Sequence, residues 1–137
     1  MRKLLIASHG RMAQGVRDTL SFFAELDQNV QTLCAFLGDR PVEDEVREYF
    51  AGVSPEDEVI IFTDLMGGSV NRAFLPYLSR PHTHLVAGMN LGLILETVMA
   101  EEGYLSTEEM AEKVELGKKG LVYLNEYRVT FDEDDDI

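Results

Sequence analysis

The first apolar segment of the sequence ends in a histidine, a side chain that can act as a nucleophile. This segment spans residues 3–8 and leads directly into His9 and Gly10. A neutral imidazole keeps a lone pair on one ring nitrogen, and that nitrogen can form a covalent intermediate with an electrophile. His9 is therefore the first candidate for a reactive group.

A carboxylate and a glycine-rich turn follow another apolar segment. Residues 58–63 contain Val-Ile-Ile-Phe, which is typical of a buried strand, and Asp64 comes directly after them. A carboxylate bound to one imidazole nitrogen fixes the tautomer, leaves the other nitrogen free to attack, and stabilises the cationic ring that forms. Gly67, Gly68 and Ser69 then precede a helical pattern, and such a turn can offer N–H groups and a hydroxyl to a phosphoryl oxyanion.

Strand-like and helix-like segments alternate along the chain and must position these residues. Strands are expected over residues 3–8, 30–37, 58–63 and 84–88, with helical patterns after each. Pro76 predicts a short or kinked third helix, Asn90 predicts the start of the fourth, and Ser106 with Glu109 has the spacing of a capping box. Gly117 and Gly120 are expected to end that last helix, and β-prone residues follow over 121–131. This order predicts an α/β fold of the flavodoxin-like, doubly wound class, with a mainly parallel sheet of four strands flanked by helices.

The predicted sheet brings the candidate residues to one edge. Ligands of such sheets bind beyond the carboxyl ends of the strands, near the point where the strand order reverses. If the first and third strands are adjacent, His9 and Asp64 are neighbours. Each residue also has a structural interpretation, because many histidines are structural, aspartates cap turns, and Gly-Gly-Ser occurs in many loops. Their shared placement favours the functional interpretation.

The composition restricts the class of protein. The chain has 137 residues and a net charge of −13, and residues 132–136 supply five of the negative charges. We expect one domain over residues 1–131 and an acidic disordered tail over 132–137. The acidic body argues against nucleic acid as a partner. No apolar run is long enough to insert into a membrane, and the N-terminal run is too short for an export signal, so a cytoplasmic location is expected.

The remaining histidines form a weak metal motif. His82 and His84 have His-x-His spacing, but the chain has only three histidines and no cysteine lies beside them. We therefore predict no metal site and no other cofactor.

Several segments together resemble a known family. Residues 7–10, 63–69 and 87–90, with the helical run 95–100, are similar in order to the mannose-type IIA components of the bacterial phosphotransferase system (PTS), a group that also includes fructose and sorbose types. The resemblance covers roughly residues 3–120. Leu65 and Met66 depart from it, because many members have threonine and an aromatic residue there.

The resemblance implies a phosphoryl carrier. His9 would accept phosphate from the phosphohistidine of HPr and pass it to a IIB component during sugar uptake. Asp64 would orient His9, while Gly10, Gly67, Gly68 and Ser69 would hold the phosphoryl group. Family members are homodimers in which a C-terminal strand joins the partner's sheet, and residues 121–131 would form that edge strand here.

Other functions remain open at this stage. A phosphocarrier subunit of a dihydroxyacetone kinase system would share the fold and the histidine. A receiver-type regulator phosphorylated on Asp64 would need an acidic pair where this chain has Ser8 and His9. A non-catalytic docking or regulatory module would have an inert His9. A hydrolase is disfavoured, since the sequence has no serine elbow.

Overall fold

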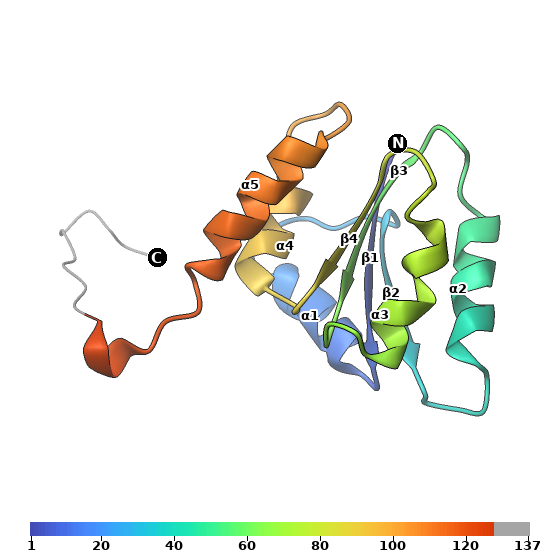
Figure 1. Cartoon of the computed structure of the whole chain (residues 1–137), viewed down its shortest axis with the longest axis horizontal. Helices are drawn as coiled ribbons and strands as arrows, with labels where there is room; N and C mark the ends of the chain where they lie inside the picture. The colour runs from blue at the N-terminus through green and yellow to red at the C-terminus, as the bar shows by residue number, and fades with distance from the viewer. Residues whose placement is uncertain (128–137) are drawn as a thin grey trace.

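The computed structural model describes residues 1–127, and its centre is a parallel sheet (Figure 1). The strands are β1 (Arg2–His9), β2 (Val30–Ala35), β3 (Glu58–Thr63) and β4 (Thr83–Ala87). Their order is β2-β1-β3-β4, and all neighbours are parallel. The predicted fold class is therefore confirmed, including the adjacency of the first and third strands.

Helices cover both faces of the sheet, as the alternation of segments predicted (Figure 1). One face packs against α1 (Met12–Leu20), α4 (Leu91–Val98) and α5 (Thr107–Lys118), and the other against α2 (Val42–Ala51) and α3 (Ser69–Ala73). Within β1, Leu4 and Ile6 belong to the first core, while Leu5 and Ala7 belong to the second. Successive side chains of a strand point to opposite faces, so a strand buried on both faces is apolar throughout.

The expected ends of the helices are mostly confirmed. The third helix stops at Ala73, and Pro76 lies in the separate 3₁₀ helix Leu75–Tyr77. Asn90 caps α4 by accepting the Leu93 N–H, and Ser106 caps α5 by accepting the Glu109 N–H.

Gly117 was expected to end α5, and this prediction is wrong. The helix continues to Lys118. The role of Gly117 is close packing. A Cβ atom at Gly117 would lie 3.2 Å from Cβ of Leu93, and the Gly117 carbonyl accepts a hydrogen bond of 2.9 Å from Nδ2 of Asn90. Glycine therefore lets α5 approach the start of α4, a tertiary requirement that local sequence does not reveal.

The segment after α5 extends away from the body of the molecule (Figure 1). Residues 121–127 form a loop with the 3₁₀ helix Leu124–Glu126 and no strand. The expected edge strand is thus not formed over these residues in the single chain, because they do not lie along a sheet edge where they could hydrogen bond. Residues 128–131 and the predicted tail over 132–137 lie outside the described residues.

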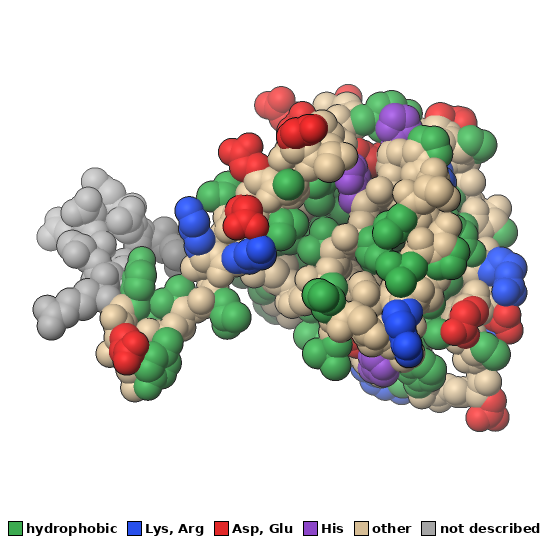
Figure 2. Space-filling view, viewed as in Figure 1, with side chains coloured by type: hydrophobic (Ala, Val, Ile, Leu, Met, Phe, Trp, Pro, Cys, Tyr) green, Lys and Arg blue, Asp and Glu red, His purple; other side chains and the backbone are tan. Residues whose placement is uncertain are grey.

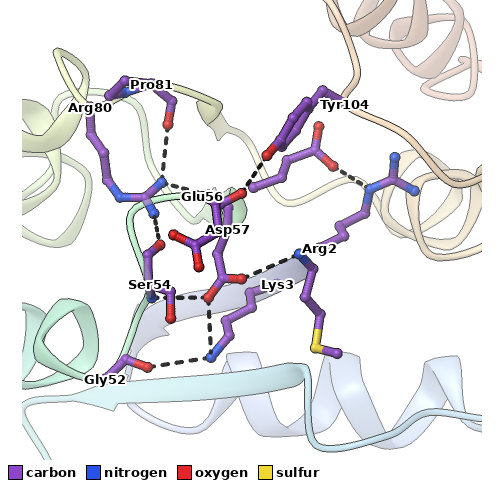
Figure 3. A network of polar contacts seen from close by, with 11 residues as sticks. Arg2, Lys3, Gly52, Ser54, Glu56, Asp57, Arg80, Pro81 and Tyr104 are labelled. Carbon is purple, nitrogen blue, oxygen red and sulfur yellow. Dashed lines mark hydrogen bonds and ion pairs between the residues drawn. The ribbon is translucent and has the colours of Figure 1, made fainter.

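A polar network ties together the amino-terminal ends of β1 and β3 (Figure 3). The Asp57 carboxylate contacts Nζ of Lys3 and the Met1 ammonium, and it accepts the Ser54 N–H. Next to it, Nε of Arg2 lies 2.6 Å from the buried Glu58 carboxylate. These charged residues fix one end of the sheet, while His9 lies at the other.

None of the helices within residues 1–127 combines the length and the hydropathy needed to cross a bilayer.

Candidate functional site: a histidine at the carboxyl edge of the sheet

His9 and Asp64 meet where β1 and β3 end. His9 is the last residue of β1, and Asp64 directly follows β3. Oδ2 of Asp64 accepts the backbone N–H of His9 at 2.7 Å and also lies 2.7 Å from Nδ1 of the His9 ring. One carboxylate oxygen therefore fixes both the backbone and the ring of His9.

This contact sets the tautomer of the imidazole. Burial by itself raises the pKa of Asp64, but the backbone and ring hydrogen bonds from His9 outweigh it and hold that pKa below its ordinary value. An ionised carboxylate only accepts hydrogen bonds, so Nδ1 must carry the proton. Nε2 is left with its lone pair, which makes it the nucleophilic atom of the neutral ring.

Ser69 lies on the nucleophilic side of the ring. Its Oγ is 3.1 Å from Nε2 of His9, and Ser69 is the first residue of α3. Gly68 lies close to the same ring, because a Cβ atom there would be 3.7 Å from Cε1 of His9. The same Cβ atom would be only 3.1 Å from the Leu65 carbonyl oxygen, so this position has little room for a side chain. The loop after β3 therefore brings a hydroxyl to the atom that would attack.

The glycines of the predicted phosphate site shape the loops around it. Gly10 and Gly67 have φ values of +59° and +75°, in the left-handed region that favours glycine. In this conformation, the N–H groups of Gly10, Gly67 and Gly68 donate to Ala35 O, Asn71 Oδ1 and Leu65 O, respectively. Phosphate binding by these amides remains a prediction, and it would require them to exchange partners.

Sequence analysis assigned no role to Ser8 or Phe36. Ser8 is fully buried, and its Oγ accepts the Ala13 N–H at 2.8 Å, which anchors the start of α1 beside His9. Phe36 has φ +65°, and its ring centroid lies 5.2 Å from that of His9. The role of Ser8 could have been suspected from the sequence, because a serine is unusual within an apolar strand. The sequence gives no indication of the role of Phe36, because its contact with His9 depends on β2 lying beside β1.

The chain matches a family model over residues 3–115, that of EIIA-man, the PTS system fructose IIA component. The chain belongs to this family. The resemblance inferred from the sequence is thereby confirmed, and the family is that of the IIA components of sugar phosphotransferase systems.

Individual relatives agree with this membership. The mannose-specific EIIAB component of the PTS from Escherichia coli K12 is 28% identical over 123 residues. The match covers 86% of this chain and 38% of that protein, so the chain spans well under half of this curated relative.

Solved structures of PTS proteins are similar over most of both chains. A Klebsiella pneumoniae structure, assigned as a permease of a phosphoenolpyruvate-dependent sugar phosphotransferase system, has a TM-score of 0.85 and 31% identity, covering 91% of this chain and 92% of the other. A PTS IIA protein associated with the fucose utilization operon of Streptococcus pneumoniae has a TM-score of 0.76 and 28% identity, with coverage of 90% and 93%.

The candidate site around His9 is exposed at the surface. The His9 side chain is 44% exposed, and Asp64 behind it is 12% exposed. Leu65 and Met66, where the sequence departs from many IIA members, are 72% and 89% exposed. Their side chains thus change the surface beside the site, while the backbone of the same loop stays close to His9.

The other histidines of this IIA chain lie at the opposite edge. The His82 ring stacks on Tyr104 with centroids 3.6 Å apart, and Nε2 of His84 lies 3.0 Å from the Leu105 carbonyl oxygen. Within residues 1–127, no three histidine, cysteine or acidic side chains are grouped as metal ligands.

Proposed function

We propose that this IIA component carries a phosphoryl group on Nε2 of His9, which it accepts from the phosphohistidine of HPr and passes to a IIB component during sugar uptake. The observation that supports this most directly is the pairing of Asp64 Oδ2 with Nδ1 at 2.7 Å, because in the neutral ring it places the lone pair on Nε2, the nitrogen that faces Ser69. A cytoplasmic location, as predicted from the sequence, belongs to the same proposal.

The transfer is an exchange of one phosphorus–nitrogen bond for another. The Nε2 lone pair of His9 attacks phosphorus in line with the donor nitrogen, the new bond forms as the donor bond breaks, and the donor imidazole keeps the released electron pair. The ring of His9 gains positive charge, which the Asp64 carboxylate stabilises through Nδ1–H. The Ser69 hydroxyl turns to donate to a phosphoryl oxygen. Transfer to IIB follows the reverse sequence, with His9 as the leaving group.

The exposure of the site fits protein partners at both steps. His9 is presented on the surface, and Phe36, Leu65 and Met66 expose apolar area on loops at the same sheet edge. Large exposed apolar side chains beside a reactive group are typical of surfaces that proteins contact.

We also propose that the chain is a homodimer. Leu121, Tyr123, Leu124 and Tyr127 are between 54% and 90% exposed. Figure 2 shows hydrophobic side chains gathered on this projecting segment, away from the body. The sheet of another copy could bury them, with residues 121–131 as the added edge strand.

The carrier role is tested by incubating the chain with phosphoenolpyruvate, enzyme I and HPr. We expect bound phosphate that is labile in acid and stable in base, that is absent from His9→Ala, and that moves to a IIB protein. No phosphate on the wild-type chain, with HPr shown to be phosphorylated, would contradict the proposal and favour the docking-module alternative.

A further inference from the structure

Asn71 is a buried polar residue beside the proposed phosphoryl site. It lies in α3, two residues after Ser69, and it is only 8% exposed. Both polar ends of its side chain are paired. Nδ2 donates to Oγ1 of Thr63 at 2.9 Å, and Oδ1 accepts the backbone N–H of Gly67 at 3.1 Å.

These bonds join three parts of the site. Thr63 is the fully buried last residue of β3, directly before Asp64. Gly67 lies in the loop between Asp64 and Ser69, and Asn71 belongs to the helix that Ser69 begins. The carbonyl of Thr63 also accepts the N–H groups of Gly88 and Met89, which follow β4. The side chain of Asn71 therefore closes a hydrogen-bonded bridge across the loop that carries both polar partners of His9.

The loop needs such a bridge because its own residues do not restrict its backbone to one conformation. Gly67 has φ +75° and is followed by Gly68, and glycine populates a wide range of backbone conformations. Before phosphate arrives, the Oδ1 contact selects one of them, and with it the position of Ser69 Oγ relative to Nε2 of His9. Loss of the bridge would free the exposed Gly67 N–H from Asn71 and let the loop relax.

We propose that Asn71, acting through Thr63 and Gly67, is the positioning residue that holds the Asp64–Ser69 loop in register with His9 for phosphoryl transfer. This inference rests on the proposed carrier function. Asn71 does not touch the reacting atoms, so its removal changes the rate of transfer within the complex with phospho-HPr more than the affinity for phospho-HPr. A misplacement of about 1 Å at a reacting group can slow a reaction by about 100-fold.

The test compares the two ends of the bridge. Asn71→Ala removes it from the helix side, and Thr63→Val removes it from the strand side without a large change in volume. Thr63→Ser keeps the oxygen that Asn71 binds and is the matched control for Thr63→Val. Asn29→Ala removes an asparagine side chain at the opposite edge of the sheet and controls for loss of the residue type.

Two quantities are measured for each variant. One is the rate of phosphoryl transfer from phospho-HPr at saturating and at low donor concentration. The other is the hydrogen exchange rate of the Gly67 amide by NMR, which reports the bridge without any phosphate. If Asn71→Ala does not fold, the Thr63 pair and the Gly67 exchange rate test the same bridge.

We expect Asn71→Ala and Thr63→Val each to slow saturated transfer by about 10- to 100-fold, with faster Gly67 exchange. The double variant should be no slower than the slower single variant, since both remove one bridge. Thr63→Ser and Asn29→Ala should transfer phosphate at close to the wild-type rate.

Faster Gly67 exchange with an unchanged transfer rate would overturn the positioning role, and so would additive losses in the double variant. A wild-type chain that takes no phosphate from competent phospho-HPr would instead overturn the carrier function, and this inference with it. The two failures are therefore distinguished by the wild-type reaction alone.

Discussion

Oδ2 of Asp64 lies 2.7 Å from both the backbone nitrogen and Nδ1 of His9. The backbone contact fixes where β1 ends relative to β3, and the ring contact fixes which nitrogen is free. The same atom thus sets both the position of the imidazole and its tautomer. A change at Asp64 should affect both.

Asp64→Asn should slow phosphoryl transfer by about 100-fold without unfolding the chain. An amide can turn its NH₂ group toward Nδ1, and this would favour the tautomer that carries its proton on Nε2, the atom that must attack. The measurement is the single-turnover rate from phospho-HPr. Asp57→Asn makes the same chemical change at the opposite edge of the sheet and should leave that rate unchanged. Equal rates for wild type and Asp64→Asn would rule out the orienting role.

Ser69→Ala should reduce the transfer rate by about tenfold or more, because a hydrogen bond to a charged group contributes about 1.5–3 kcal/mol. Ser106→Ala is the matched control. Its hydroxyl caps α5 far along the chain, so its loss should lower the free energy of unfolding by about 1 kcal/mol and leave transfer intact. A full-rate Ser69→Ala variant would show that the 3.1 Å contact with Nε2 plays no part in the reaction.

The Asp57 network should make the chain less stable in acid. The Ser54 N–H, together with the Met1 ammonium and Lys3, lowers the pKa of Asp57 from its ordinary value of 3.8. A pKa that is lower in the folded state adds stability above 3.8, and this stability is lost as the pH falls from there through the folded-state pKa. The melting temperature of Asp57→Asn should therefore lie below that of wild type near neutral pH, and the difference should shrink in acid. A constant difference across this range would contradict the assignment.

Tyr49→Phe should stabilise the chain in base. Burial raises the pKa of Tyr49 from 10.0 to about 12, so the folded state disfavours the phenolate. A raised pKa gives stability that is complete below pH 10 and is lost as the pH rises toward 12, by about 3 kcal/mol in total.

The free energy of unfolding of Tyr49→Phe should not show this loss between pH 10 and 12. Chemical unfolding at several pH values measures it. Near neutral pH the variant should be as stable as wild type or about 1 kcal/mol more stable, because the buried Tyr49 hydroxyl has no hydrogen-bond partner among residues 1–127. A clear loss of stability near neutral pH would mean that the hydroxyl is bonded in solution.

Substitution of the projecting segment should change the oligomeric state. Leu121→Ser combined with Leu124→Ser removes two apolar side chains that are 90% and 65% exposed in the single chain. If another copy buries them, light scattering should find the wild type as a dimer and the variant as a monomer at the same concentration. Phe22→Ser, a change at an exposed apolar residue just after α1, is the control and should remain dimeric. A monomeric wild type would contradict the proposed homodimer.

The order of the elements and the candidate reactive residues could be predicted from the amino-acid sequence alone. Apolar runs such as Val59–Phe62 are buried on both faces, so their composition identified them as inner strands without any knowledge of their neighbours. Asn90 and Ser106 form the predicted caps because capping depends on residues only three positions apart. His9 and Asp64 could be named because each lies at the carboxyl end of such a strand.

Which of these residues come into contact, and with what geometry, depends on the folded chain. The hydrogen bonds that His9 donates to Asp64 span 55 positions of sequence and exist because β3 pairs with β1. Asn71 looks like any polar residue of a helix until the fold buries it between Thr63 and Gly67, and Gly117 looks like a helix terminator until α4 packs against it. Local residue preferences act over a few positions, whereas burial and long-range pairing depend on the whole chain, so these roles emerge only once the sheet and its helices have formed.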